Sequence, residues 1–162
     1  MILTFLNNKT LRVIISLIFI LFMLVVLPLI QSLNPHAWPD TMLFYSSDRF
    51  YGLIESYGHE QRSLYIILRW TFDLVYPLVY GLYFLTWILY LSQKKTLLIY
   101  PLLGIGFDYI ENILATVTVG MYPKELPFLV YLMQGFSLLK WLFLLISICI
   151  LIFLVYRRFK HD

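Results

Sequence analysis

The chain has few charged residues, and this shortage decides its class. Only 13% of the 162 residues are Asp, Glu, Lys or Arg, whereas 61% are hydrophobic. The mean hydropathy is +0.82. A water-soluble domain of this size exposes much more charge than this. The composition therefore predicts an integral membrane protein.

Cysteine and histidine are also scarce. Cys149 is the only cysteine, so the chain has no pair for an internal disulfide. The histidines, His36, His59 and His161, are far apart and lack the spacing of zinc ligands. No GxSxG elbow or glycine-rich phosphate loop occurs either. We therefore predict no metal and no cofactor.

What the chain does have is long apolar runs. About 20 residues are needed to cross a bilayer, and the runs predict an all-α, four-helix bundle in one transmembrane domain, residues 1–162. The first run could be a cleaved signal peptide, but the apolar core of such a peptide has only about 7 to 15 residues. We expect it to be retained as a span. The four predicted spans cover about 11–33, 61–92, 96–119 and 126–156.

The longest polar stretch is the predicted outer loop, residues 34–60. Within it, apolar residues recur at helical spacing, and a short amphipathic helix is expected, starting at a cap residue and ending at a glycine. The sequence leaves open whether this helix is a lid on the bundle, a lipid contact or a gate. The residues of this pattern are Ser47, Phe50, Leu53, Ile54, Tyr57 and Gly58.

Basic residues are distributed unequally between the two sides of the predicted bundle. Seven lie on the side of the chain ends: Lys9, Arg12, Lys94, Lys95, Arg157, Arg158 and Lys160. The other side has Arg49, Arg62 and Lys124, together with five acids. By the positive-inside rule, both termini are predicted to be cytoplasmic, in a multi-pass protein of the cell membrane. Topology also explains the net charge of +3, so we predict no nucleic-acid binding.

A candidate site is indicated by ionisable residues inside the apolar runs, where charge is costly. Helical spacing aligns them on one face of each span. The second span has Arg62, Tyr65, Arg69, Asp73, Tyr76 and Tyr80; the third has Asp108, Glu111 and Asn112; the fourth has Gln134, Ser137 and Lys140. Counting along the spans places the charged groups in the outer half of the bundle, where they could meet. The first span adds no ionisable group to this cluster, so we expect it to close the bundle on the lipid side.

The charges of this cluster do not balance. Three carboxyls face only Arg69 and Lys140, so either Arg62 pairs with the third carboxyl or one acid keeps its proton. We favour the second alternative, with Asp108, the deepest acid, as the protonated group. We regard Asp108, Glu111 and Lys140 as catalytic candidates. The other nine residues are ligand-binding candidates.

Three functions remain open at this point. The cluster could bind or act on a lipid or other amphiphile, with the cations holding an anionic head group. It could belong to a proton- or ion-coupled transport subunit. It could also be structural, because buried ion pairs fix helix packing in accessory membrane proteins. Membrane lipid is the expected partner, with a homo-oligomer or another membrane protein as a further possibility, and the sequence does not decide whether the chain is an enzyme.

Several short motifs resemble those of small uncharacterised four-span bacterial membrane proteins. They are Arg62-x-x-Tyr65, Asp73, Pro77, the Asp108–Asn112 segment DYIEN and Leu139-Lys140-Trp141. The likeness covers roughly residues 40–156, and Gln61 stands where the similar chains have glycine. The resemblance implies an architecture and a polar cluster, but no activity.

Overall fold

The computed structural model describes residues 2–33, 39, 42 and 44–161. It is all-helical, with no strand among these residues. Four helical stretches are long and apolar enough to cross a membrane: Lys9–Ser32, Gly58–Ser92, Lys95–Gly120 and Pro127–Lys160. The predicted all-α class and the four long apolar helices are confirmed. Most of the 34–43 part of the predicted outer loop lies outside the described residues.

The first stretch is continuous but not uniform. It comprises α2 (Lys9–Leu21), the π-helical turn η1 (Phe22–Val26) and α3 (Leu27–Ser32). Pro28 stands in the first turn of α3. Its ring has no N–H and crowds the preceding turn, and a wider turn just before it relieves that crowding. A short helix, α1 (Ile2–Leu6), precedes this stretch and was not expected from the sequence.

The second stretch is broken in the middle. Helix α5 (Gly58–Trp70) is capped by Thr71, and α6 (Phe72–Ser92) starts at the next residue and continues through Pro77. The stretch begins three residues earlier than predicted, at Gly58, whose positive φ of 66° suits glycine. The third stretch is the 3₁₀ turn η3 (Lys95–Leu98) with α7 (Ile99–Gly120), and the fourth is α8 (Pro127–His161).

A short helix, α4 (Ser47–Ser56), lies between the first two long stretches in sequence. Its N-cap is Ser46, whose Oγ accepts the Arg49 N–H, so the prediction of Ser47 as the cap was wrong by one residue. The Tyr51 hydroxyl accepts the Leu126 N–H at 2.6 Å, tying α4 to the start of α8. Burial raises the pKa of this hydroxyl and the Glu125 carboxylate raises it further, while the Leu126 N–H acts in the opposite direction. The hydroxyl is therefore neutral at physiological pH.

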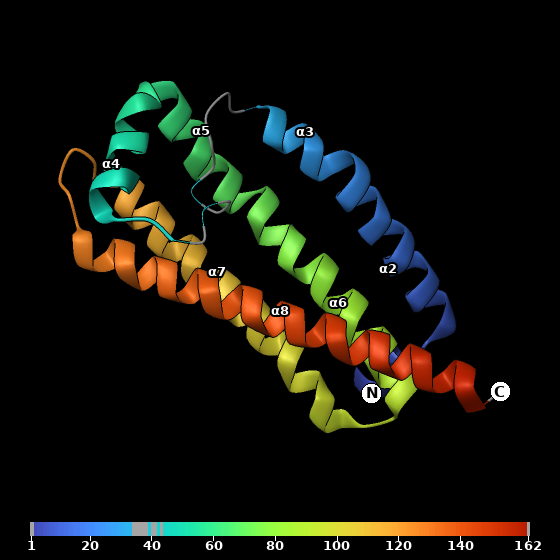
Figure 1. Cartoon of the computed structure of the whole chain (residues 1–162). Coiled ribbons are helices and arrows are strands. Elements are labelled where there is room, and N and C mark those ends of the chain that lie inside the picture. Colours follow the sequence, from blue (N-terminus) through green and yellow to red (C-terminus); the bar gives the residue numbers. More distant parts are fainter. Residues whose placement is uncertain (1, 34–38, 40–41, 43, 162) are drawn as a thin grey trace.

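Both termini lie at one end of the bundle, called here the terminal end, and α4 lies at the other, the loop end (Figure 1). Helix α7 packs along α8, and α6 contacts α2, α7 and α8. Gly81 on α6 allows this packing, because a Cβ there would collide with the Ile105 side chain of α7. At the terminal end, an apolar core fills the space between the helices with Leu6, Tyr80, Phe84, Leu85, Ile88, Leu89, Leu98 and Leu154.

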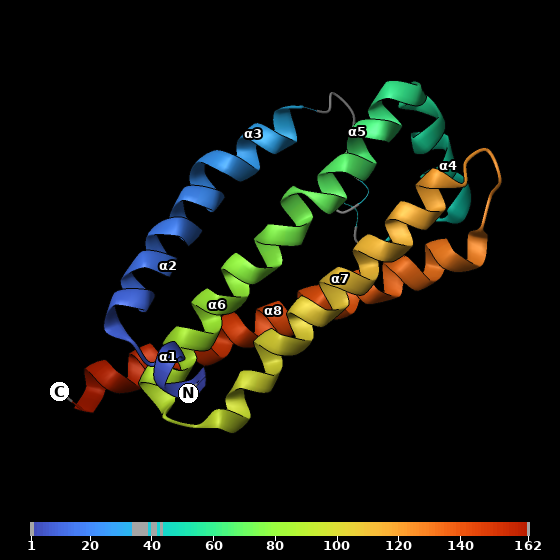
Figure 2. The same cartoon turned by 180° about the vertical axis from the view of Figure 1, so that it is seen from behind.

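The first long stretch is the least buried of the four. Only 6% of its most apolar 18-residue segment is buried within the protein, against 50% for the corresponding segment of the second stretch. Near the terminal end it packs on α6, where Phe19 stacks on Tyr83 with ring centroids 4.4 Å apart. At the loop end, the Gln61 amide donates to the Leu33 carbonyl at 2.9 Å. Between these two attachments, α3 stands away from α5 in both views (Figures 1 and 2).

Candidate functional site

The candidate site begins with Arg69, at the end of α5. Its side chain is only 3% exposed and pairs with Asp73 Oδ2 at 3.1 Å across the α5–α6 break. It also donates to the Tyr65 hydroxyl at 2.5 Å, and the guanidinium carbon lies 4.5 Å from the centre of the Tyr65 ring. The predicted pair of Arg69 with Asp73 is therefore formed, and Tyr65 joins it.

Asn112 of α7 connects this pair to the next helix. Its Oδ1 accepts from Arg69 Nη1 at 2.9 Å, and its Nδ2 donates to the Asp73 backbone carbonyl at 3.0 Å. Pro77 explains why that carbonyl accepts a side chain: it is the residue four positions after Asp73, and proline has no N–H to complete the helical hydrogen bond. The proline and the asparagine thus act together, from two helices.

Lys140 of α8 forms the second half of the cluster. Its ammonium lies 2.6 Å from Glu111 Oε2 and 3.7 Å from Asp108 Oδ1. Asp108 also accepts from the Tyr80 hydroxyl at 2.8 Å, and Asn112 Nδ2 lies 3.5 Å from its other oxygen. Because Asn112 touches both halves, the cluster forms one network across α5, α6, α7 and α8.

Three predicted residues lie elsewhere or have a different role. Arg62 donates to the Ile54 carbonyl at 3.2 Å, and its guanidinium carbon lies 4.6 Å from the centre of the Tyr122 ring, so it anchors α4. Arg62 therefore does not serve the third carboxyl, which leaves the other alternative, a retained proton on one acid. Gln134 donates to the Tyr45 carbonyl at 3.1 Å, and Ser137 is buried one turn before Lys140.

A cavity of about 580 Å³ lies beside the cluster, between the first long stretch and helices α5, α6 and α8. That volume is typical of sites for small ligands. Polar groups line one part of it: Gln31, Tyr65, Arg69, Asp73, Tyr76, Tyr80, Asp108 and Lys140. The remaining wall is apolar, formed by Phe19, Met23, Leu27, Ile30, Leu68, Phe72, Phe84, Trp141, Leu144, Leu145 and Ile148.

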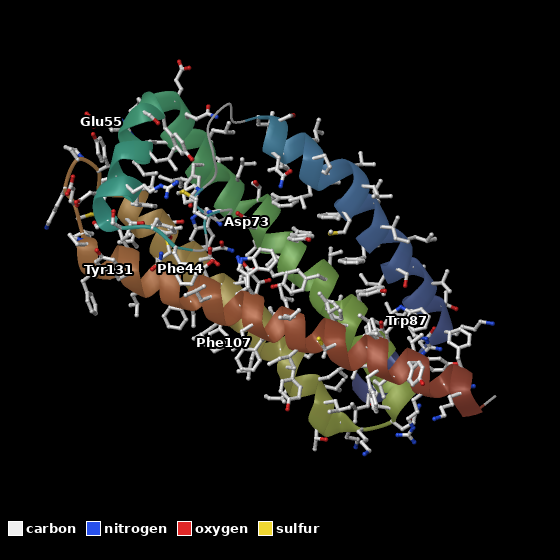
Figure 3. The ribbon with its side chains drawn as sticks, viewed as in Figure 1. Phe44, Glu55, Asp73, Trp87, Phe107 and Tyr131 are labelled. Carbon is white, nitrogen blue, oxygen red and sulfur yellow. The ribbon has the colours of Figure 1, made fainter. Side chains whose placement is uncertain are left out.

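Side-chain positions show where the site lies along the bundle. In Figure 3, Asp73 lies further from the loop end than Glu55 and Tyr131, which lie at that end. Tyr76 faces the first long stretch, because its hydroxyl contacts Met23 Sδ at 3.0 Å. The site thus has a charged part and an apolar part joined in one cavity.

One wall of the cavity was missed by sequence reasoning. The first span was expected only to close the bundle on the lipid side, since it adds no ionisable group to the cluster. Five of its residues nevertheless line the cavity: Phe19, Met23, Leu27, Ile30 and Gln31. Their spacing places them on one helix face. Because nearly every residue of this run is apolar, no contrast between polar and apolar faces could have identified the face that lines the cavity.

Comparisons with protein-family models, curated proteins and solved structures give no match. The resemblance to four-span bacterial proteins therefore remains one of short motifs, and the function has to be argued from the geometry.

The chemistry available in this geometry is limited in kind. Among the described residues, no group of three His, Cys, Asp or Glu side chains is placed to hold a metal ion. Lys140, Asp108 and Glu111 are close enough to exchange a proton, and Asp108 and Lys140 also line the cavity. The arrangement can bind a polar group and can move a proton to or from it.

Proposed function

We propose that this chain is a multi-pass protein of the cell membrane, with both termini in the cytoplasm, and that it binds an amphiphile in the cavity beside α6. The observation that carries the proposal is the division of that cavity into a charged part and an apolar part. A lipid-like molecule is divided in the same way. Its head group would meet the cluster, and its chain would lie against the wall shared by the first long stretch and α8.

The arrangement of the helices supports entry from the side. Only 6% of the most apolar part of the first long stretch is buried within the protein, and five residues of this stretch line the cavity, so an acyl chain could reach the cavity past this thinly packed helix. The seven basic residues that predict a cytoplasmic terminal end lie in α2, η3 with the residue before it, and α8. With that orientation, the cluster would lie in the outer half of the membrane.

A through-path for ions receives less support. Between the cluster and the terminal end, the described core is apolar. The buried hydroxyls there, those of Thr86 and Ser147, donate to carbonyls of their own helices. Further polar side chains toward that end, Trp87, Ser16 and the buried Arg12, bond one another or nearby carbonyls of the first long stretch and the turn before it. This arrangement favours a binding site over a transport path.

Blocking the cavity tests the proposal. Leu145 and Ile152 are both exposed apolar residues of α8, but only Leu145 lines the cavity. We expect wild-type protein, purified in mild detergent, to retain about one lipid or amphiphile per chain by mass spectrometry. Leu145→Trp should lose most of it, and the matched control Ile152→Trp should keep it. Equal retention by the two variants would contradict the proposal.

A further inference from the structure

The polar part of the cavity contains more acid than base. Among the described residues, the cluster has three carboxyls, Asp73, Asp108 and Glu111, and two cations, Arg69 and Lys140. Three negative and two positive charges leave one negative charge in excess when all five groups are ionised, and a bound cation can balance this charge in place of the proton that one acid was expected to keep. Both cations already lie against carboxylates, so they offer little to an anionic head group. The sequence-based expectation that the cations hold an anionic head group is therefore not favoured.

The acid nearest to open space is Asp73. Its side chain is 20% exposed, against 9% for Asp108 and 3% for Glu111. Two acids, Asp73 and Asp108, and two cations, Arg69 and Lys140, line the cavity. The two cations are only 3% and 8% exposed, so the charged group most open to the space where a head group would lie is the Asp73 carboxylate.

Aromatic rings line the cavity together with this carboxylate. Phe72 and Tyr76 line the cavity on either side of Asp73 in the α6 sequence, and their rings are stacked with centroids 5.2 Å apart. Tyr76 also contacts Tyr80 edge-on at 5.4 Å. Aromatic faces attract ammonium groups through their quadrupole, and a carboxylate beside them adds direct charge attraction. Aromatic faces repel anions for the same reason.

We infer that the head group bound in this cavity carries an ammonium group, which lies against Asp73 and the neighbouring aromatic rings. This inference rests on the proposed amphiphile site and specifies its ligand class. A second cavity of about 980 Å³, near the terminal end, has the opposite character, because Lys94, Arg157 and Arg158 line it. These basic side chains suit an anionic head group better than the lining of the first cavity does.

Fluorescence of Trp141, which lines the first cavity, provides the test. The other tryptophans, Trp38, Trp70 and Trp87, are replaced by phenylalanine, and the protein is placed in lipid nanodiscs. Three probes share one brominated alkyl chain and differ only in the head group: trimethylammonium, maltoside or carboxylate. Quenching is measured against the mole fraction of probe in the disc, so general contact with the bilayer affects all three alike.

We expect the trimethylammonium probe to reach half-quenching at a mole fraction about tenfold lower than the maltoside probe, with the carboxylate probe weakest. Asp73→Asn should abolish this preference, whereas Glu55→Gln, which removes an acid of α4 outside the cavity lining, should preserve it. Equal quenching by the three probes, or preference for the carboxylate, would overturn the ammonium inference and leave the amphiphile site standing. Absence of saturable quenching by any probe would overturn both.

Discussion

The excess of acid in the cluster predicts that removing a cation and removing an acid change the stability of the protein by different amounts. Replacing Lys140 with methionine leaves Glu111 and Asp108 without the cation that now lies 2.6 and 3.7 Å from them. Both carboxylates are more than nine-tenths buried, and removing one partner of a buried ion pair costs about 3 to 5 kcal/mol. Lys140→Met should lower the free energy of unfolding by that amount.

Asp73→Asn should behave differently. The substitution keeps the shape and an acceptor for Arg69, which also retains Asn112 and Tyr65 as partners. It lowers the excess negative charge from one to zero, whereas Lys140→Met raises it to two. We therefore expect Asp73→Asn to cost less than Lys140→Met, about 1 to 2 kcal/mol, because the buried Arg69 keeps other acceptors.

The assay is reversible unfolding of both variants in mixed micelles, followed by circular dichroism. Lys140→Met combined with Glu111→Gln should recover most of the lost stability, because it removes the unpaired acid together with its cation. Equal destabilisation by Asp73→Asn and Lys140→Met would refute the reasoning. It would mean that every charge is needed for packing, and it would favour the structural role for the cluster.

Three further outcomes follow from the structure. Asn112→Ala should lower the free energy of unfolding by about 1 to 3 kcal/mol, because it leaves the Asp73 carbonyl and Arg69 short of a partner. In a Pro77→Ala background the helical N–H is restored, so unfolding measurements should show a smaller cost. An unchanged cost would contradict the link between Asn112 and Pro77. Gly81→Ala should give up most of the roughly 1 kcal/mol that alanine normally gains over glycine in a helix, because the Ile105 side chain has to move away from the new methyl group. In an Ile105→Ala background the same substitution should stabilise the protein, and strict additivity of the two changes in the same assay would rule out the contact. A membrane-impermeant maleimide should label Lys124→Cys in intact cells but not the wild-type chain, whose single cysteine lies in α8; labelling that required broken cells would reverse the proposed orientation.

The sequence was sufficient for the helices because apolar runs are the strongest signal in this chain. The run ends were placed to within a few residues, except that α8 extends further and α5 starts earlier than expected. Charged residues beyond an apolar run, such as Arg157 and Lys160, do not end a helix when nothing else breaks it. Composition gave no sign of the π-helical turn before Pro28, since that turn is a local response to proline geometry.

Helical spacing was also sufficient to bring together the centre of the site. Asp73, Asp108, Glu111 and Lys140 are linked as expected because each lies on a polar face that has to be buried. The position of Arg62 was predicted wrongly, because the polar face of the second span continues beyond the cluster toward α4. There the Arg62 guanidinium donates to the Ile54 carbonyl instead.

The cavity could not have been predicted from spacing alone. It depends on how far the first long stretch stands from α5 and α6, and that separation is a property of the packing of several helices. The bond from Asn112 to the Asp73 carbonyl could have been anticipated, because Pro77 releases that carbonyl and a buried amide nearby can take it.

The most direct test of the central claim is to find where a lipid chain lies. A phospholipid with an ethanolamine head group and a photoreactive diazirine in its acyl chain would be irradiated with the protein in nanodiscs, and labelled residues mapped by mass spectrometry. We expect saturable labelling at the cavity residues Met23, Leu27 and Ile148, suppressed by unlabelled lipid and by Leu145→Trp. Uniform labelling that includes Leu24 and Ile152, exposed positions outside the cavity lining, and that resists competition would contradict the amphiphile site.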